Sequence, residues 1–195
     1  IKEKEKKIIL AKQLVTADIK KAKEFYKQSL EKGEEGVMAK SLSAEYKPGS
    51  RVGYGVKIKP IMEPLDLVIV KAEYGEGKRS GWLTSFTLAC WNKNKEKLLR
   101  IGKVSTGLKE LESEGVSFKE ITEKLKPLIV KSYGKTVKVQ PEIIIEVNYE
   151  EIQKSPKYSS GYALRFPRFS RLRTEKTLDE INTIEDIENF YEIQK

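Results

Sequence analysis

The sequence predicts an α+β protein that is mostly β, and three observations support this fold class. After residue 62, five stretches carry the apolar patterns and bounding turns that are typical of strands. One helical pattern, around residues 117–129, separates the third of these strands from the fourth. Before residue 62 the chain holds one helical pattern and two short strands, too few to bury a core. We therefore expect residues 1–61 to end a larger domain and residues 62–195 to form a complete one.

The first region is predicted as a helix followed by two strands. Apolar residues recur at helical spacing over residues 17–32, with Thr16 or Asp18 as the cap and Gly33 after the end. The elements that follow are a strand, a turn and a second strand: EGVMAK (35–40), KPGSR (47–51) and GYGVKIKP (53–60).

The second region is predicted from alternating apolar patterns and turns. Its strands are expected at 66–74, 82–91, 97–105, 142–153 and 162–173. The fifth is expected to break at Pro167. A capping box of Ser117 and Glu120 begins the helix, whose inward stripe consists of Phe118, Ile121, Leu125, Leu128 and Ile129. Three strands, a helix and two strands is the order of the five-stranded OB-fold barrel, which often binds nucleic acid. A generic α+β sandwich is the alternative.

The charge balance indicates an anionic partner without proving one. The chain has 38 Lys and Arg residues against 29 Asp and Glu residues, a formal net charge of +9. Such an excess favours nucleic acid, because cations that neutralise phosphates release counterions. A surface with 34% charged residues is also common in heat-stable proteins. Composition alone leaves these two explanations equal.

Residue types that are missing narrow the chemistry further. The sequence has no histidine, which removes Ser-His triads, histidine bases and histidine-ligated metals. The single cysteine, Cys90, lies in the apolar run FTLACW and is expected to be a buried thiol. One cysteine suits a reducing compartment, so we expect a cytoplasmic protein, and no apolar run approaches transmembrane length. The first residue is Ile1 rather than Met, so we expect a piece of a longer chain.

The stretch RFPRFSRLRTEK at 165–176 has four arginines and one lysine against a single acid. Arginine forks bind phosphate oxygens in bidentate fashion and are costly to hold together without an anion. The interleaved aromatic residues are expected to hold the strand to the core. We therefore expect one face of this strand on the barrel and the other on a negatively charged ligand.

The order of several such stretches resembles the ATP-dependent DNA ligases, most closely the archaeal type. In sequence order they are EGVMAK, GYGVKIKP, GEGKRSGWLTSFTLA, IGKVSTGL and RFPRFSRLRTEK. In those enzymes the EGVMAK and VKIK strands are the fourth and fifth nucleotidyltransferase motifs, and RFPRFSRLRTEK contains the sixth. The resemblance implies the C-terminal edge of an adenylation domain at 1–61 and an OB-fold domain with an acidic helical tail at 62–195.

The resemblance also implies a reaction, with ATP and Mg²⁺ as cofactors and nicked double-stranded DNA as substrate. Such ligases seal nicks through lysyl-AMP and DNA-adenylate intermediates. The nucleophilic lysine belongs to a KxDG motif, which the sequence lacks, so no catalytic residue is expected in this chain. The other partner implied is the N-terminal part of the same ligase, and a monomer is expected.

Motif positions imply roles for individual residues. Glu35 matches the carboxylate that places a divalent metal. Arg51 and Lys57 match positions that contact the nucleotide phosphate. Lys59 matches the second lysine of the fifth motif and is also expected to bind the nucleotide cofactor. The residues that match the sixth motif, which orients the β- and γ-phosphates of ATP, are Arg171, Arg173 and Lys176. Arg165 and Arg168 are left open between DNA contacts and structural carboxylates.

Two rival functions remain at this point. An mRNA capping enzyme shares the nucleotidyltransferase motifs, although the GEGKRSGWLTSFTLA segment favours a ligase. The other rival is a non-catalytic OB-fold module that only binds nucleic acid.

The acidic tail from Thr177 also has two interpretations. Its helix, capped by Thr183, either packs on its own barrel or docks reversibly on the basic face near Lys57 and Lys59. In the second case, deletion from Ile184 onward is expected to tighten DNA binding and leave the barrel folded.

Overall fold

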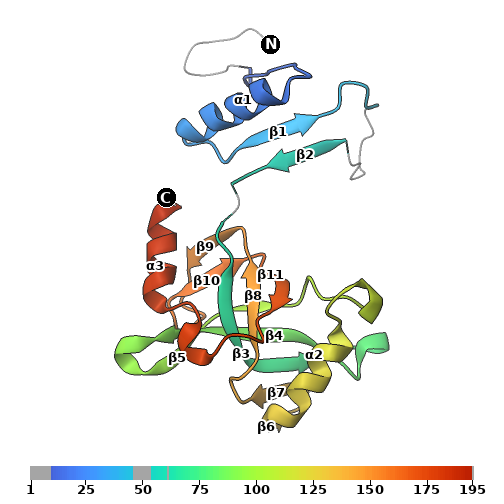
Figure 1. The fold of residues 1–195 in the computed structure, drawn as a ribbon, viewed down its shortest axis with the longest axis vertical. Helices are drawn as coiled ribbons and strands as arrows, with labels where there is room; N and C mark the ends of the chain where they lie inside the picture. Colours follow the sequence, from blue (N-terminus) through green and yellow to red (C-terminus); the bar gives the residue numbers. More distant parts are fainter. Residues whose placement is uncertain (1–9, 46–53, 61, 195) are drawn as a thin grey trace. The chain divides into compact units, whose positions relative to one another are not determined.

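The computed structural model describes residues 10–45, 54–60 and 62–194. The chain divides into two units, residues 1–61 and residues 62–195 (Figure 1). Each unit has its own helices and strands.

The first unit consists of a helix and a two-stranded antiparallel ribbon: α1 (Ile19–Glu31), β1 (Val37–Lys40) and β2 (Gly55–Ile58). Asp18 caps α1, because its carboxylate accepts hydrogen bonds from the backbone N–H groups of Lys20 (2.7 Å) and Lys21 (3.4 Å). None of the described residues in these elements is buried, as expected for elements that lack a core of their own. The predicted turn at 47–51 lies outside the described residues.

The second unit is built on an antiparallel sheet in which β11 (Arg168–Leu172), β8 (Ile144–Asn148), β3 (Leu65–Tyr74), β4 (Leu83–Asn92) and β5 (Lys97–Val104) are neighbours in that order. Beyond the end of β8, β3 pairs instead with β7 (Thr136–Val139), which forms a hairpin with β6 (Ile129–Tyr133). The β6–β7 hairpin was not predicted from the sequence.

The last two predicted strands are each interrupted. β8 is followed by β9 (Glu151–Lys154), and β10 (Tyr162–Arg165) is followed by β11. β9 pairs with β10 and β8 pairs with β11, so the four segments form one broken hairpin. The predicted break at Pro167 is confirmed, and Phe166 beside it adopts a positive φ of 47°.

Contacts between β5 and the β10–β11 strand close the sheet into a barrel. The Ser160 N–H donates to the Arg100 carbonyl at 3.1 Å, and the Phe169 N–H donates to the Thr106 carbonyl at 2.9 Å. Between these two bonds, Gly102 on β5 faces the side chain of Leu164. This closure, together with the helix between the third and fourth predicted strands, confirms the OB-fold prediction.

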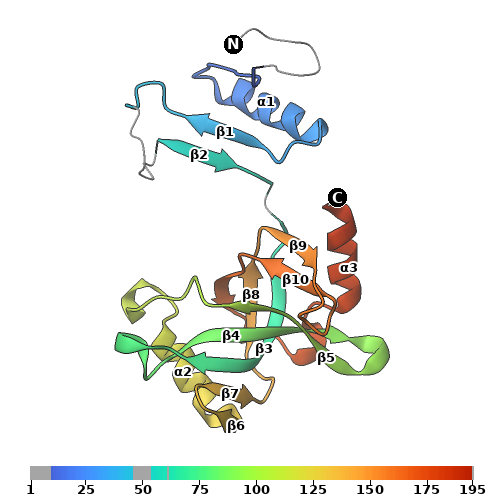
Figure 2. The same ribbon diagram turned by 180° about the vertical axis from the view of Figure 1, so that it is seen from behind.

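The helix α2 (Phe118–Leu125) seals one end of the barrel beside β6 and β7 (Figure 2). Ser117 caps it by accepting the Glu120 N–H at 3.0 Å, as predicted. Phe118, Ile121 and Leu125 are buried, so the first part of the predicted stripe is confirmed. The helix ends earlier than predicted, because Leu128 belongs to the 3-10 turn η4 (Lys126–Leu128), which contains Pro127, and Ile129 begins β6. Both residues still pack against the core. Three further 3-10 turns lie in connections: η1 (Gly77–Arg79), η2 (Lys93–Lys95) and η3 (Glu112–Glu114).

The core of this unit fills the barrel. Its largest fully buried side chains include Phe86, Leu88, Ile101 and Ile145. The predicted burial of Cys90 is confirmed, and burial raises the pKa of its thiol to about 12, which keeps the thiol protonated and inert.

The acidic tail forms η5 (Leu178–Glu180) and the helix α3 (Ile184–Ile193), which packs along β9 and β10 (Figures 1 and 2). Thr183 caps α3 as predicted, and Ile184 and Ile187 are buried in the barrel core. The Gln194 side chain hydrogen-bonds both the N–H and the carbonyl of Ile152. The helix therefore packs on its own barrel, the first of the two interpretations. No helix in the described ranges is long and apolar enough to cross a membrane.

Candidate functional site

The predicted site residues fall into two clusters, one in each unit. The first lies on the β1–β2 ribbon, where Lys57 stands opposite Met38. Its ammonium group donates to the carboxylate of Glu35, which lies two residues before the start of β1. The predicted metal-binding carboxylate and a predicted phosphate-binding lysine are therefore neighbours. Lys59, at the end of the same ribbon, is half-buried, and Arg51 lies outside the described residues.

Gly36 fixes the position of Glu35 relative to β2. It adopts a φ of 136°, and a Cβ at this position would overlap the carbonyl oxygen of Ile58. Only glycine allows the chain to pass this close to β2 at such a φ. The Ser29 hydroxyl on α1 donates to the Gly36 carbonyl at 2.9 Å, which ties the crossing to the helix. Sequence reasoning missed Gly36 as a residue that positions the site.

The second cluster surrounds Arg173, just after β11. Its Nη1 lies 2.8 and 2.9 Å from the two carboxylate oxygens of Asp66 and 3.2 Å from Glu146 Oε2, and its Nε lies 2.6 Å from Glu175 Oε1. The Lys176 ammonium lies 2.7 Å from Asp66 Oδ2. The donors of both cations are thus turned toward carboxylates of their own barrel.

The sheet register explains this arrangement. Asp66 on β3 stands directly opposite Glu146 on β8, and Glu146 stands opposite Arg171 on β11. Two carboxylates side by side repel each other, so an intervening cation is needed to stabilise the pair. The side chains of Asp66, Glu146 and Arg173 are only 12%, 14% and 15% exposed, which strengthens both the repulsion and the attraction.

Charge and hydrogen bonding shift the acid–base behaviour of this cluster. Burial by itself raises the pKa of Glu146, but hydrogen bonds from Arg171 and Ser170 and the charges of Arg171 and Arg173 outweigh it and hold that pKa below its ordinary value. The hydrogen bond to Glu175 raises the pKa of Arg173 further, so this guanidinium stays charged.

The cations of the arginine-rich stretch differ in how exposed their charged groups are and in which carboxylates they contact. Arg171 contacts Glu146 through Nε at 3.0 Å and Nη2 at 2.9 Å, but its side chain is 59% exposed. Arg165 pairs with Glu151 at 3.2 Å, which is one of the two alternatives predicted for it, a structural carboxylate. Arg171 is therefore the predicted site residue of this stretch with the most accessible charge.

The aromatic residues of the stretch have different roles from each other. Phe169 is 6% exposed and belongs to the barrel core, as predicted. Phe166 is 67% exposed and lies beneath the guanidinium of Arg165, 5.2 Å from the ring centre. The prediction that the aromatics hold the strand to the core is thus wrong for Phe166, because the break at Pro167 turns its side chain outward.

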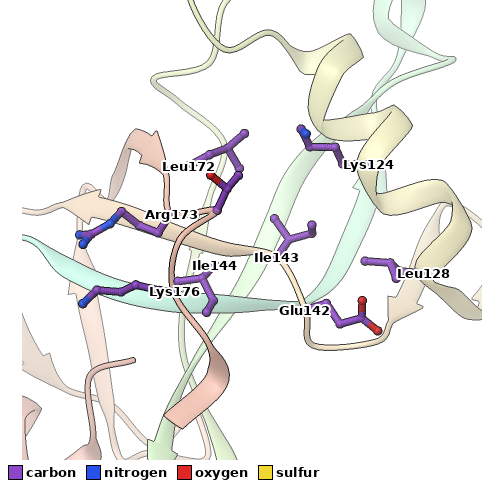
Figure 3. Close-up of a pocket in the computed structure, with 9 residues that line it drawn as sticks. Lys124, Leu128, Glu142, Ile143, Ile144, Leu172, Arg173 and Lys176 are labelled. Atoms are coloured by element: carbon purple, nitrogen blue, oxygen red, sulfur yellow. The ribbon is translucent and has the colours of Figure 1, made fainter. Parts of the chain in front are cut away.

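A cleft of about 250 Å³ lies next to this cluster, between the end of β11 and the α2–η4 connection (Figure 3). Ile143, Ile144 and Leu172 contribute apolar surface to it, and Lys124 and Glu142 stand on the far side. Figure 3 shows the charged ends of Arg173 and Lys176 pointing away from Lys124 and Glu142. The aliphatic parts of these two side chains therefore form a wall of the cleft, while their charged groups contact Asp66 and, for Arg173, also Glu146.

Metal-binding groups are sparse in the part of the chain that the structure describes. No group of three or more His, Cys, Asp or Glu side chains is close enough there to hold an ion. Asp66 and Glu146 already serve as partners of Arg173, whereas the carboxylate of Glu35 is 71% exposed and has an exchangeable lysine partner. A metal at Glu35 would need most of its ligands from phosphate oxygens and water, which is the usual coordination of Mg²⁺ at nucleotide sites.

Sequence reasoning missed the acids that hold the second cluster together. Asp66 and Glu146 are acids within strongly apolar strands, which read LDLVIV (65–70) and IIIEV (143–147). A lone acid in a buried strand usually needs a cationic partner, so this pattern was the available signal. Their proximity to each other depends on strand register, which the sequence alone does not specify.

Known proteins resemble the chain from end to end. The family described as ATP dependent DNA ligase domain matches residues 1–59, and the family described as ATP dependent DNA ligase C terminal region matches residues 79–176. Curated relatives include a DNA ligase of Nanoarchaeum equitans, 55% identical over 100% of this chain and 35% of its own length, and a DNA ligase of Archaeoglobus fulgidus, 52% identical over 96% and 33%. The chain therefore spans about a third of the length of these relatives.

A solved structure supports the same relationship. The crystal structure of the ligase domain from M. tuberculosis LigD is 28% identical and superposes with a TM-score of 0.50, covering 80% of this chain and 50% of that one. The fold predicted from the order of strands is thus also found in a known ligase domain.

Proposed function

Since the chain belongs to the ATP-dependent DNA ligases, we propose that it is the C-terminal part of an enzyme that seals nicks in double-stranded DNA. Residues 1–61 are the edge of its adenylation domain and residues 62–195 its OB-fold domain. The observation that carries this proposal is the juxtaposition of Glu35 and Lys57 at the ribbon, inside the matched ligase domain. An isolated nucleic-acid-binding module has no need of such a carboxylate–lysine pair.

The first cluster supports a role in binding the nucleotide. Lys57 and Lys59 bind its phosphate, as does Arg51. Glu35 would hold Mg²⁺ through its exposed carboxylate, and the ion would offset phosphate charge. The ammonium group of Lys57 would then be available to a phosphate oxygen instead of to Glu35.

The second cluster supports binding of the β- and γ-phosphates of ATP. Arg171 can contact a phosphate with little rearrangement, because more than half of its side chain is exposed. Arg173 and Lys176 must exchange a carboxylate of Asp66 for a phosphate oxygen. Such an exchange keeps both cations paired, and its cost is the loss of their pairing with Asp66.

The experiment is nick sealing by the complete ligase that carries this chain. With ATP and Mg²⁺ the unchanged enzyme should join a nicked duplex, and Lys57→Ala should slow the joining by about a hundredfold or more, as is typical when a charge that stabilises phosphoryl transfer is lost. Lys27→Ala on α1 is the matched control, because Lys27 pairs with Glu31 on an exposed helix face. Equal sealing by the two variants would remove Lys57 from the site, and no sealing by the unchanged enzyme would refute the function.

A further inference from the structure

A row of lysines crosses five neighbouring strands of the barrel. Strand register places Lys103 on β5 opposite Thr87 on β4, and Thr87 opposite Lys71 on β3. Lys71 in turn stands opposite Lys138 on β7, and Lys138 stands opposite Lys131 on β6. We call these four lysines the lysine row. Directly opposite residues share one face of a sheet, so all four project to the same side.

That side is the outside of the barrel. The adjacent row along the same strands consists of Val104, Phe86, Ala72, Val137 and Ser132, and its first four members are buried. Successive residues of a strand point to opposite faces, so the lysine row faces solvent. Lys103, Lys131 and Lys138 are exposed and Lys71 is half-buried.

The charge of this face is poorly balanced within the protein. Lys103 pairs with Glu73 at 2.6 Å, and Glu73 is the acid of the next outward row, opposite Ser85 and Thr136. Lys71, Lys131 and Lys138 form no ion pair with any carboxylate in the described part of the chain, and Lys131 instead lies 4.9 Å from the ring centre of Tyr133. Like charges on directly opposite strand positions repel each other and destabilise a sheet. Folding alone gives no reason to place these three lysines side by side.

From this arrangement we propose that the lysine row binds the sugar-phosphate backbone of duplex DNA. The inference rests on the proposed function, and it adds a binding surface to the barrel. Strands lie about 4.8 Å apart, so the row extends over roughly 19 Å, which is the length of several base pairs. Lysine is a flexible point charge that follows a phosphate backbone and reads no base sequence. The row therefore positions DNA without regard to sequence.

The test is the salt dependence of DNA binding by this 195-residue chain, with a short fluorescein-labelled blunt duplex as the probe. The triple variant K71Q/K131Q/K138Q removes the three unpaired charges. Its affinity should be at least about tenfold lower at moderate salt, and the slope of log K against log salt should become shallower by about 3, one for each lost phosphate contact. The control K93Q/K109Q/K157Q removes as many exposed charges from three separate loops and should leave the slope almost unchanged.

Two further measurements distinguish a loss of DNA contacts from a loss of folding in the triple variant. Thermal melting of the triple variant should match or exceed that of the unchanged chain, because repulsion is removed, and K71R/K131R/K138R should retain binding because guanidinium groups also pair with phosphate. If the triple variant and the control bind alike, the lysine row is not the DNA surface, although the proposed function stands. If the unchanged chain does not bind the duplex at any salt concentration, the proposed DNA surface of this barrel is refuted as well.

Discussion

Arg173 stands between two carboxylates that would otherwise repel each other. Asp66 and Glu146 are directly opposite on β3 and β8, and both contact Nη1 of this one guanidinium. All three side chains are at most 15% exposed, so water cannot replace the cation effectively. A residue expected only to bind ATP phosphates is thus also part of what holds β3, β8 and the end of β11 together.

This arrangement predicts a large loss of stability for Arg173→Ala. Asp66 and Glu146 would lose their shared partner and keep only Lys176 and Arg171, so the free energy of unfolding should fall clearly further than in Arg171→Ala. Arg171→Ala is the matched control, since its exposed side chain leaves the Arg173 pairing intact, and its cost should be below about 1 kcal/mol. Urea unfolding of both variants measures the difference. Equal losses would show that Arg173 has no special structural role.

The lowered pKa of Glu146 predicts a pH dependence of stability. Its pKa is lower in the folded chain than in the unfolded chain, so its contribution to the unfolding free energy is fully present above the unfolded pKa of about 4.3. That contribution is lost as the pH falls through the lower, folded pKa. In Glu146→Gln, stability should therefore fall less steeply between pH ~5 and the folded pKa than in the unchanged chain. Glu188→Gln, at an exposed position of α3, controls for the loss of one carboxylate. Unfolding in urea at a series of pH values measures both slopes, and identical slopes would contradict the prediction.

At the level of residues, the sequence identifies charge more readily than it identifies pairing. The arginine-rich stretch is visible as a run, and so are Glu35 and Lys57 through the motifs that contain them. The pairing of Arg173 with Asp66 joins residues 107 positions apart, and it depends on the register of β3, β8 and β11. Residue patterns within single strands indicate which face is buried, but they do not identify which residue stands opposite which.

α3 illustrates how an acidic element can still be structural. Glu188 and Glu192 are exposed, while Ile184 and Ile187 enter the barrel core. Tyr191 packs against Tyr162 with ring centres 5.3 Å apart. Asn182 just before it exchanges hydrogen bonds with the backbone of Asp66, at 2.8 and 3.0 Å. This packing argues against the expectation that the barrel stays folded when residues from Ile184 onward are deleted.

The packing of α3 predicts a contrast between two isoleucines of the same helix. Ile187 is fully buried, and Ile187→Ala should lower the free energy of unfolding by about 3 kcal/mol, through lost burial and the cavity that remains. Ile193 is 79% exposed, and Ile193→Ala should change it by less than about 0.5 kcal/mol. Chemical unfolding of the two variants checks this, and a mild effect at Ile187 would mean that α3 is only loosely attached.

At the level of elements, long apolar strands and capped helices were predictable and short polar ones were not. β3 and β4 have strong apolar patterns, and Ser117 and Thr183 mark the starts of α2 and α3. The β6–β7 hairpin has only two fully buried residues, Val137 and Val139, and its KSYGKT turn resembles a surface loop. It is held by pairing with β3, a tertiary contact that local preference does not reveal.

At the level of the whole molecule, the two units differ in how completely they bury their apolar residues. The barrel has a continuous core, whereas Met38, Val56 and Ile58 on the β1–β2 ribbon are exposed. A ribbon with exposed apolar residues is what one expects of a sheet whose other strands belong to a larger domain. The chain also spans about a third of the length of its relatives. The motif order made this organisation predictable, because it places the matched region late in a ligase.

The same organisation predicts that this chain cannot perform the first step of ligation by itself. Self-adenylation needs a lysine nucleophile with a lowered pKa, held in a pocket beside the nucleotide. The sequence contains no KxDG motif, and its motif lysine, Lys57, is 41% exposed and paired with Glu35. Incubation with ATP labelled at the α-phosphate and Mg²⁺ should therefore leave no covalent label on this chain, whereas the complete ligase should be labelled on a lysine outside it. Gel separation under denaturing conditions followed by autoradiography distinguishes the two outcomes, and treatment with pyrophosphate, which reverses adenylation, controls for non-specific labelling. Pyrophosphate-sensitive label on the 195-residue chain would overturn the roles proposed here, because one of its own lysines would then be the nucleophile.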